Sequence, residues 1–415
     1  MSDGGRWRLP DARPAEGAWR SGNRVELLEN GEEFFARAFA AIGGAHTEIL
    51  IETFILFEDK VGNELHRLLV DAAGRGVRVE LIVDGYGSPS FSDGFLAALA
   101  EAGVRFRAYD QQPTLLGVRT NVFRRLHRKL LVVDGTRAFV GGINFSADHL
   151  TDFGPAAKQD YAVELEGPIV ADIRGFALVA LASDGTGRHW RPPSMATGDH
   201  AGDAKAMLLV RDNARRRTSI EHEYRRAIRG ARREVVIANA YFFPGYGFLR
   251  DLRHAARRGV RVSLLVQGEP DTPIALRAAR TLYPHLVEAG VCIHEYCQRP
   301  FHGKVAWVDD DWATVGSSNL DPLSLSLNLE ANVFVRSPAF NDSLRERIGT
   351  LLEHHCRAVD PATVPKRTLW QRLTRPLLFH CLRRFPRWAG LLPAHTPRVA
   401  LLRPPAVRLP EEPPP

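Results

Sequence analysis

The chain has 415 residues, 45% of them hydrophobic and 25% charged, which is an ordinary composition for a globular protein with room for two domains. Its apolar runs are too short for a membrane-spanning helix, and its N-terminal residues lack the apolar segment of a signal peptide. The four cysteines match no zinc-binding or disulfide pattern, so a reducing compartment is expected.

The net charge of +7 is unevenly distributed along the chain. The stretch 366–408 holds ten basic residues and no acidic one, and Glu411 and Glu412 follow it. The tail therefore carries about +8 and the remaining chain about −1. Duplex binding depends on many phosphate contacts, so a near-neutral body argues against nucleic acid as the substrate. A basic tail favours contact with an anionic surface.

In chain order, the predicted elements occur twice. In each half, a strand rich in β-branched residues is followed by a predicted helix, at 62–74 in the first half and 248–258 in the second. Each helix ends at an Arg-Gly pair, and a buried strand follows. The glycine is expected to end the helix in a left-handed conformation. The matching segments are 48–54 with 234–241, 75–83 with 258–266, 101–106 with 288–293, 127–134 with 302–309, 141–144 with 316–319, and 159–163 with 329–333.

A period of 170 to 187 residues is far too long for a solenoid and indicates two fused copies of one domain. Strand–helix–strand alternation predicts α/β layers with right-handed crossovers. The expected boundaries are an N-terminal extension at 1–24, a first repeat at 25–190, a linker at 191–206, a second repeat at 207–360 and a tail at 361–415.

Each copy carries one motif, His-x-Lys-x4-Asp, followed by a glycine turn and an asparagine. Residues two apart on an extended strand point to the same face, so the histidine and lysine converge, while the aspartate closes the strand. An asparagine amide after the turn can bind a phosphoryl oxygen. The candidate site residues are His127, Lys129, Asp134 and Asn144 in the first copy and His302, Lys304, Asp309 and Asn319 in the second.

These residue types suit phosphodiester transfer. One neutral imidazole can attack phosphorus and form a phosphoenzyme, and a second can protonate the leaving alkoxide and then deprotonate the acceptor. Lysines and asparagines neutralise charge on the phosphoryl oxygens, and a carboxylate behind each imidazole sets its tautomer. A duplicated domain supplies one histidine from each side of a single phosphate, and the chemistry requires no metal or other cofactor. A single His-x-Lys pair is common and indicates little. The prediction of a catalytic site depends on the whole motif occurring once in each copy, at matching positions of the duplication.

The segments NVFRRLHRKLLVVDGTRAFVGGINFSADHL and HGKVAWVDDDWATVGSSNLDPLSLSLNLEANV resemble the phospholipase D superfamily over roughly residues 25–360, and within it the bacterial cardiolipin synthases. The tail segment LRRFPRWAGLLPAHTP is similar to their B type. The resemblance implies two pseudo-twofold-related α/β/α sandwich domains and transfer of a phosphatidyl group between two phosphatidylglycerols, giving cardiolipin and glycerol. It also implies His127 as the nucleophile, His302 as the acid/base, and Asp160 and Glu330 as acids that orient the two histidines.

Between Leu369 and Trp388, apolar residues recur near helical spacing and arginines interleave with them, which is typical of an interfacial segment on anionic lipid. We therefore expect a peripheral protein on the cytoplasmic face of the cell membrane, with phosphatidylglycerol as partner, no nucleic acid and no obligatory protein partner. The alternatives are a phosphodiesterase or nuclease using the same site, a phosphatidyltransferase with another donor such as phosphatidylethanolamine, and a non-catalytic membrane scaffold.

Overall fold

A computed structural model describes residues 17–88, 90–111, 114–115, 118–119, 124–182, 185–193, 198–268, 276, 279–322, 324–325, 327–363 and 399–402. The predicted interfacial segment of the tail lies outside these residues. None of the described helices combines the length and the apolar character needed to cross a membrane.

The first copy alternates strands and helices as the sequence predicts. Its β1 begins within the range expected to be an N-terminal extension. Its elements are β1 (Arg20–Glu29), α1 (Asn30–Gly43), β2 (Glu48–Thr53), α2 (Lys60–Gly74), β3 (Arg78–Asp84), α3 (Asp93–Glu101), β4 (Arg105–Tyr109), β5 (Thr114–Leu115), β6 (Val118–Arg119), β7 (Leu130–Val133), β8 (Arg137–Gly141), the short 3₁₀ turns η1 (Ala147–His149) and η2 (Thr151–Phe153), β9 (Tyr161–Glu166) and α4 (Ile169–Ala182).

The second copy repeats this order, and its β10 begins within the range expected to be a linker. Its elements are β10 (Ala204–Arg211), α5 (Ser219–Gly230), β11 (Glu234–Asn239), α6 (Tyr246–Arg257), β12 (Arg261–Gln267), α8 (Tyr283–Val287), β13 (Cys292–Tyr296), β14 (Lys304–Val308), β15 (Trp312–Gly316), β16 (Glu330–Arg336), α9 (Pro338–His354) and β17 (Cys356–Ala358); β18 (Val399–Leu401) comes from the tail.

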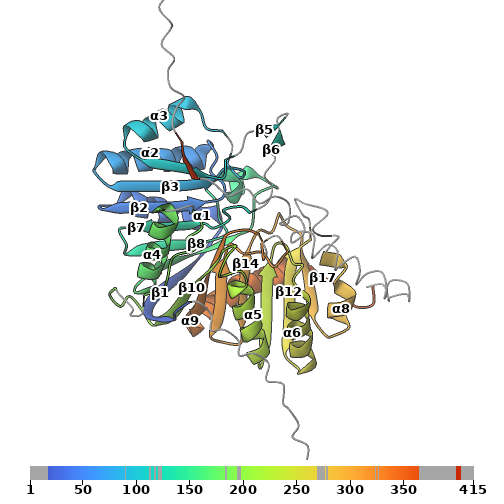
Figure 1. Ribbon diagram of the computed structural model, residues 1–415. Helices are drawn as coiled ribbons and strands as arrows, with labels where there is room; N and C mark the ends of the chain where they lie inside the picture. Colours follow the sequence, from blue (N-terminus) through green and yellow to red (C-terminus); the bar gives the residue numbers. More distant parts are fainter. Residues whose placement is uncertain are drawn as a thin grey trace, which may run out of the picture.

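The strands of both copies join in one sheet. From β10 outward the order is β16-β15-β14-β11-β12-β13, and from β1 outward it is β9-β8-β7-β2-β3-β4, so the two halves are equivalent. The halves meet where β1 pairs antiparallel with β10, with Arg20 opposite Ala206 (Figure 1). This arrangement confirms the pseudo-twofold α/β architecture. The tail strand β18 pairs with β4 at the outer edge of the first half.

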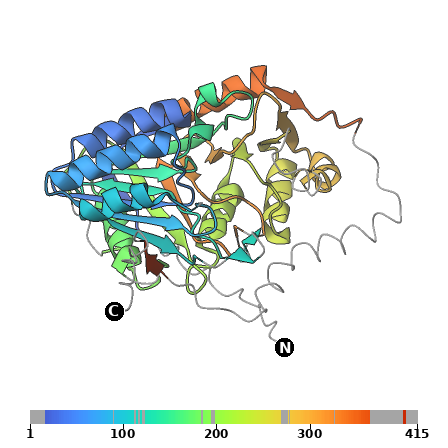
Figure 2. The same ribbon diagram turned by 90° about the horizontal axis from the view of Figure 1, so that it is seen from above.

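Helices cover both faces of the sheet and bury three apolar clusters. In the first copy, α1, α2 and α3 pack on one face, and α1 and α2 lie side by side along it (Figure 2). The helices α5, α6 and α8 do the same in the second copy. On the other face, α4 and α9 share a central cluster to which strands of both copies contribute. The two copies therefore form one structural unit.

Local sequence signals account for the helix ends. Asp59 precedes α2 and accepts hydrogen bonds from the backbone N–H groups of Val61 and Gly62, as an N-cap residue does. After α2 and α6, Gly76 and Gly259 have φ values of +88° and +91°. The left-handed glycine expected after each Arg is thus confirmed in both copies.

Candidate active site

The site lies where the two copies meet, at the start of β7 and β14. His127 precedes β7 and His302 precedes β14, and each is almost wholly buried. Each motif segment forms a short bridge with the other copy. The His127 N–H donates to the carbonyl of Leu329 over 2.9 Å, and the His302 N–H donates to the carbonyl of Gln159 over 2.7 Å. Each histidine is therefore fixed by backbone of the opposite copy, next to that copy's acid.

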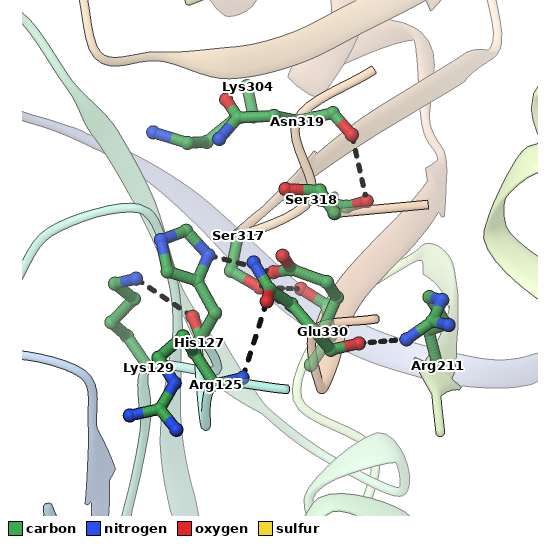
Figure 3. Close-up of polar contacts among 12 residues, drawn as sticks. Arg125, His127, Lys129, Arg211, Lys304, Ser317, Ser318, Asn319 and Glu330 are labelled. Carbon is green, nitrogen blue, oxygen red and sulfur yellow. Dashed lines mark hydrogen bonds and ion pairs between the residues drawn. The ribbon is translucent and has the colours of Figure 1, made fainter. Parts of the chain in front are cut away.

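Two imidazole–carboxylate pairs result, and both cross between the copies. Nδ1 of His127 lies 3.0 Å from Oε2 of Glu330, which begins β16 (Figure 3). Nδ1 of His302 lies 2.5 Å from Oδ2 of Asp160, which precedes β9. A carboxylate on Nδ1 holds the proton there and leaves the Nε2 lone pair available for chemistry. Asp160 and Glu330 therefore each contact a motif histidine, and their role in orienting it stays a prediction.

The motif lysines lie within the same buried site. Nζ of Lys129 donates to the carbonyl of His127 over 2.8 Å, and Nζ of Lys304 donates to the carbonyl of His302. Lys129 also lies 5.2 Å from the centre of the Phe54 ring. Burial lowers the pKa of Lys129 to about 7, with Glu330 opposing the shift and Lys304 adding to it. An incoming anion would stabilise the charged form of Lys129.

Both imidazoles are held in the neutral form. Burial lowers the pKa of His127, although the Glu330 carboxylate opposes this, and Lys129 lowers it further. Burial lowers the pKa of His302 well below its ordinary value, and the ammonium groups of Lys304 and Lys158 add to the shift. A neutral imidazole is the nucleophilic form, so the site without substrate is ready for attack on phosphorus.

The motif aspartates do not lie behind the imidazoles, and that expectation was wrong. Asp134 accepts hydrogen bonds from the backbone N–H groups of His46, Thr47 and Glu48, at the far end of β7. His127 and Asp134 are seven positions apart on an extended segment, which corresponds to roughly 20 Å. Asp309 binds the equivalent backbone groups at 232–234 in the second copy. The aspartates therefore fasten the loop that enters β2 or β11.

Replacing Asp134 is expected to lower stability and to leave the chemistry intact. Asp134 has a φ of 53°, which asparagine tolerates and alanine does not. We expect Asp134→Ala to lower the free energy of unfolding by about 1–2 kcal/mol and Asp134→Asn by less, as measured by urea denaturation. The kcat of both variants should stay within about twofold of wild type, because Asp134 contacts neither histidine. A large loss of kcat in a folded Asp134→Asn protein would contradict this assignment.

The same carboxylate gives a pH dependence with a defined sign. Partial burial raises the pKa of Asp134, but the hydrogen bonds from Thr47, His46 and Glu48 outweigh it and hold the pKa below its ordinary value. Its contribution is therefore present above the unfolded-state pKa of about 3.9 and is lost as the pH falls through the lower folded value. The stability difference between wild type and Asp134→Asn should shrink below about pH 4.

The two asparagines occupy different environments. Oδ1 of Asn144 accepts a hydrogen bond from the Ile55 N–H over 3.1 Å, which leaves its NH₂ group to serve a phosphoryl oxygen. Oδ1 of Asn319 is buried and has no hydrogen-bond partner among the described residues. The Asn319 and Lys304 side chains point toward the region of the His127 ring (Figure 3). Phosphate binding by these asparagines remains a prediction.

Sequence reasoning missed three groups around the carboxylates. Ser317 donates from its hydroxyl to Oε2 of Glu330 over 2.5 Å. His149 is fully buried, and its ring centre lies 5.9 Å from that of His302. Lys158 pairs with Asp148 and acts on His302 through its charge. Ser317 stands within the repeated turn, where the second copy has Gly-Ser and the first Gly-Gly, and that difference was the available signal.

The donor atoms of His149, Asp160 and His302 all lie within 4.8 Å of one another, a spacing that a cation could use. The surrounding charges oppose one, because Lys304, Lys158 and Lys129 all act on His302. A bound cation would also displace the Asp160–His302 hydrogen bond. The donor set is therefore better suited to an anionic substrate than to a metal.

Comparison with known proteins places this geometry in a family. The family model described as "Cardiolipin synthase, PLD-like domain" matches residues 39–172 and 224–352, one segment in each copy. The chain is 54% identical to cardiolipin synthase B of Escherichia coli K12 over 94% of this chain and 95% of that protein. It is likewise 54% identical to cardiolipin synthase B of Salmonella typhi, over 94% of each chain. A crystal structure of phosphatidylserine synthase from Haemophilus influenzae shares the fold, with a TM-score of 0.65 at 14% identity over 88% of this chain and 93% of that one.

Proposed function

Because the chain belongs to the family of cardiolipin synthases with phospholipase D-like domains, we propose that it transfers a phosphatidyl group from one phosphatidylglycerol to another, giving cardiolipin and glycerol. The observation that carries the proposal is the pair of crossed imidazole–carboxylate contacts, His127 with Glu330 and His302 with Asp160. These contacts leave two Nε2 atoms, one from each copy, for one phosphate. No cofactor takes part.

In the first step, Nε2 of His127 attacks the phosphorus of phosphatidylglycerol, and the bond from phosphorus to the headgroup oxygen breaks. His302 gives its proton to that oxygen, and glycerol leaves. In the second step, His302 takes the proton of a headgroup hydroxyl on a second phosphatidylglycerol. The resulting oxygen attacks phosphorus, the P–N bond breaks, and cardiolipin forms. Lys129, Lys304, Asn144 and Asn319 bind the phosphoryl oxygens throughout.

When the substrate binds, His302 must take up the proton that it later donates. Burial and the neighbouring ammonium groups keep His302 neutral in the free protein. A phosphodiester anion offsets the charge of those lysines, so its binding raises the pKa of His302 and favours uptake of a proton. The protein then holds a neutral nucleophile and a charged acid on opposite sides of the phosphate.

The direct test supplies purified protein with headgroup-labelled phosphatidylglycerol in mixed micelles. We expect labelled glycerol and cardiolipin in equal amounts. Parallel reactions contain phosphatidylethanolamine as donor, or single- and double-stranded DNA. Phosphatidic acid as the only lipid product would indicate hydrolysis in place of transfer. DNA cleavage with unreacted lipid would overturn the proposal.

The lysine at the first motif gives the reaction a pH dependence. Since the pKa of Lys129 is lowered to about 7, the free protein loses this positive charge at higher pH. We expect kcat/KM to fall above about pH 7, because the neutral amine no longer stabilises the phosphoryl oxygens. A guanidinium keeps its charge throughout, so Lys129→Arg should lose this alkaline decline even if its activity is lower at every pH. An unchanged alkaline decline in Lys129→Arg would assign the titration to another group.

The substrate requires work at a membrane surface, and the family acts in phospholipid metabolism. We propose peripheral association with the cytoplasmic face of the cell membrane through the basic tail, with phosphatidylglycerol as the lipid partner. The charge supports this: ten basic residues and no acidic one lie in 366–408. A full-length protein in which Arg383, Arg384 and Arg387 are replaced by Gln keeps β18 in the sheet. It should sediment less with vesicles containing anionic lipid and keep its activity on short-chain, soluble substrate.

A further inference from the structure

The carboxylates of the two imidazole–carboxylate pairs differ in the further hydrogen-bond donors beside them. In the second copy, the Ser317 hydroxyl donates to Oε2 of Glu330, the same oxygen that contacts His127. The equivalent position in the first copy is Gly142. A Cβ atom there would lie 2.3 Å from Oδ1 of Asp160, so no larger side chain fits without displacing the acid. Asp160 therefore cannot accept a hydrogen bond from a hydroxyl group in this turn.

His149 occupies the space beside Asp160. It ends the 3₁₀ turn η1 and is fully buried. The backbone N–H of Asn144 donates to its Nε2 over 3.2 Å. Because Nε2 accepts, the neutral ring carries its proton on Nδ1. Burial lowers the pKa of His149 to about 4, so the neutral ring is the form present near neutral pH.

The Nδ1 atom of His149 lies near the Asp160 carboxylate but does not yet bond to it. Nδ1 lies 4.0 Å from Oδ2 of Asp160, the oxygen that contacts His302. Nδ1 is buried and has no hydrogen-bond partner among the described residues. A buried donor without a partner is unfavourable, and a small movement of the ring or of Asp160 would satisfy it.

We propose that His149 is a positioning residue for the acid/base histidine: its Nδ1–H group donates to Asp160 as positive charge develops on His302, in the role that the Ser317 hydroxyl has toward Glu330. The inference rests on the proposed function, in which His302 exchanges protons with the leaving and entering alcohols. In the two halves of this pseudo-symmetric site, the carboxylates would thus accept from different groups, a serine hydroxyl at Glu330 and an imidazole N–H at Asp160. In this proposal His149 acts through Asp160 and does not itself bind the substrate.

The two ring nitrogens can be tested separately. In His149→Asn, the side-chain NH₂ replaces the donor at Nδ1 and the contact with the Asn144 N–H is lost. In His149→Gln, the side-chain oxygen replaces the acceptor at Nε2 and the donor is lost. A role through Asp160 predicts that Asn retains more kcat than Gln or Ala. If His149 only holds the turn at Asn144, Gln retains more than Asn, and the proposal is overturned.

The leaving group gives a second readout. Glycerol needs a proton as it leaves, whereas nitrophenolate leaves without one. With phosphatidylglycerol as donor, we expect His149→Ala to slow the first release of glycerol by about tenfold or more. With phosphatidyl-p-nitrophenol, the burst of nitrophenolate, one per site, should keep nearly the wild-type rate. Equal slowing with both donors would overturn the inference.

Ser317→Ala is the matched control, because it removes the hydroxyl that donates to Glu330, the carboxylate paired with the nucleophile His127. The nucleophile acts on either donor, so the burst of leaving group should slow with both phosphatidylglycerol and phosphatidyl-p-nitrophenol. Thermal unfolding of all variants shows whether each is folded at the assay temperature. A separate variant tests the proposed function independently of the role of His149. A burst that survives in His127→Ala refutes the nucleophile assignment, whatever His149 does.

Discussion

His127→Ala is expected to lower cardiolipin formation by about 10⁴-fold or more, and to abolish the covalent intermediate. The substitution removes the only Nε2 that the proposed reaction uses as nucleophile. Lys129 and Lys304 would still bind the phosphate, so KM for phosphatidylglycerol should change little. The measurement is kcat in mixed micelles, together with single-turnover release of labelled glycerol.

His302→Ala is the paired variant. It should lower kcat with phosphatidylglycerol to a similar degree, because the leaving glycerol then lacks its proton donor. With phosphatidyl-p-nitrophenol it should still release one nitrophenolate per site and then stop. Near-wild-type turnover in either variant would contradict a mechanism with paired histidines.

The second large effect is expected at the crossed acids. Glu330→Gln and Asp160→Asn keep the size of each side chain and remove its charge. Without the carboxylate, the imidazole loses both its fixed tautomer and the stabilisation of its charged form. We expect kcat to fall by about 10²–10⁴-fold in each variant, as for carboxylates in other triads. Each acid belongs to the copy opposite its histidine, so either substitution impairs a histidine from the other half of the chain.

Glu80→Gln is the control for burying a neutral amide in place of a carboxylate. Glu80 is almost fully buried in β3 and is bound by Arg78, Arg105 and Arg107. Its replacement should lower the midpoint of urea unfolding and leave kcat unchanged. If Glu330→Gln behaved in the same way, Glu330 would have a structural role only.

The sequence predicted the layers of the fold because its signals are local and occur twice. Strand and helix periodicity, the Arg-Gly helix ends and the ordered matches between halves each constrain short segments. The convergence of His127 with Lys129 follows from strand geometry alone. These signals were sufficient for the duplicated α/β architecture and for the motif histidines and lysines.

The partners of the histidines could not be predicted from spacing. Glu330 lies more than two hundred positions from His127, and the two meet in the folded protein, where Leu329 forms a bridge with the segment before His127. Analogy with other triads pointed to Asp134, although the length of β7 already separates it from His127. His149 carried no repeated pattern, since it has no histidine counterpart in the second copy, so only its three-dimensional contacts indicate a role.

The most direct measurement is to locate the covalent intermediate. Wild-type protein turning over phosphatidylglycerol labelled in its phosphate is quenched in alkali, which preserves phosphohistidine, and is then digested. We expect the label on the peptide that contains His127. Label on the peptide that contains His302, or cardiolipin formation with no labelled peptide, would contradict the assignment of His127 as nucleophile in a single site built by both copies.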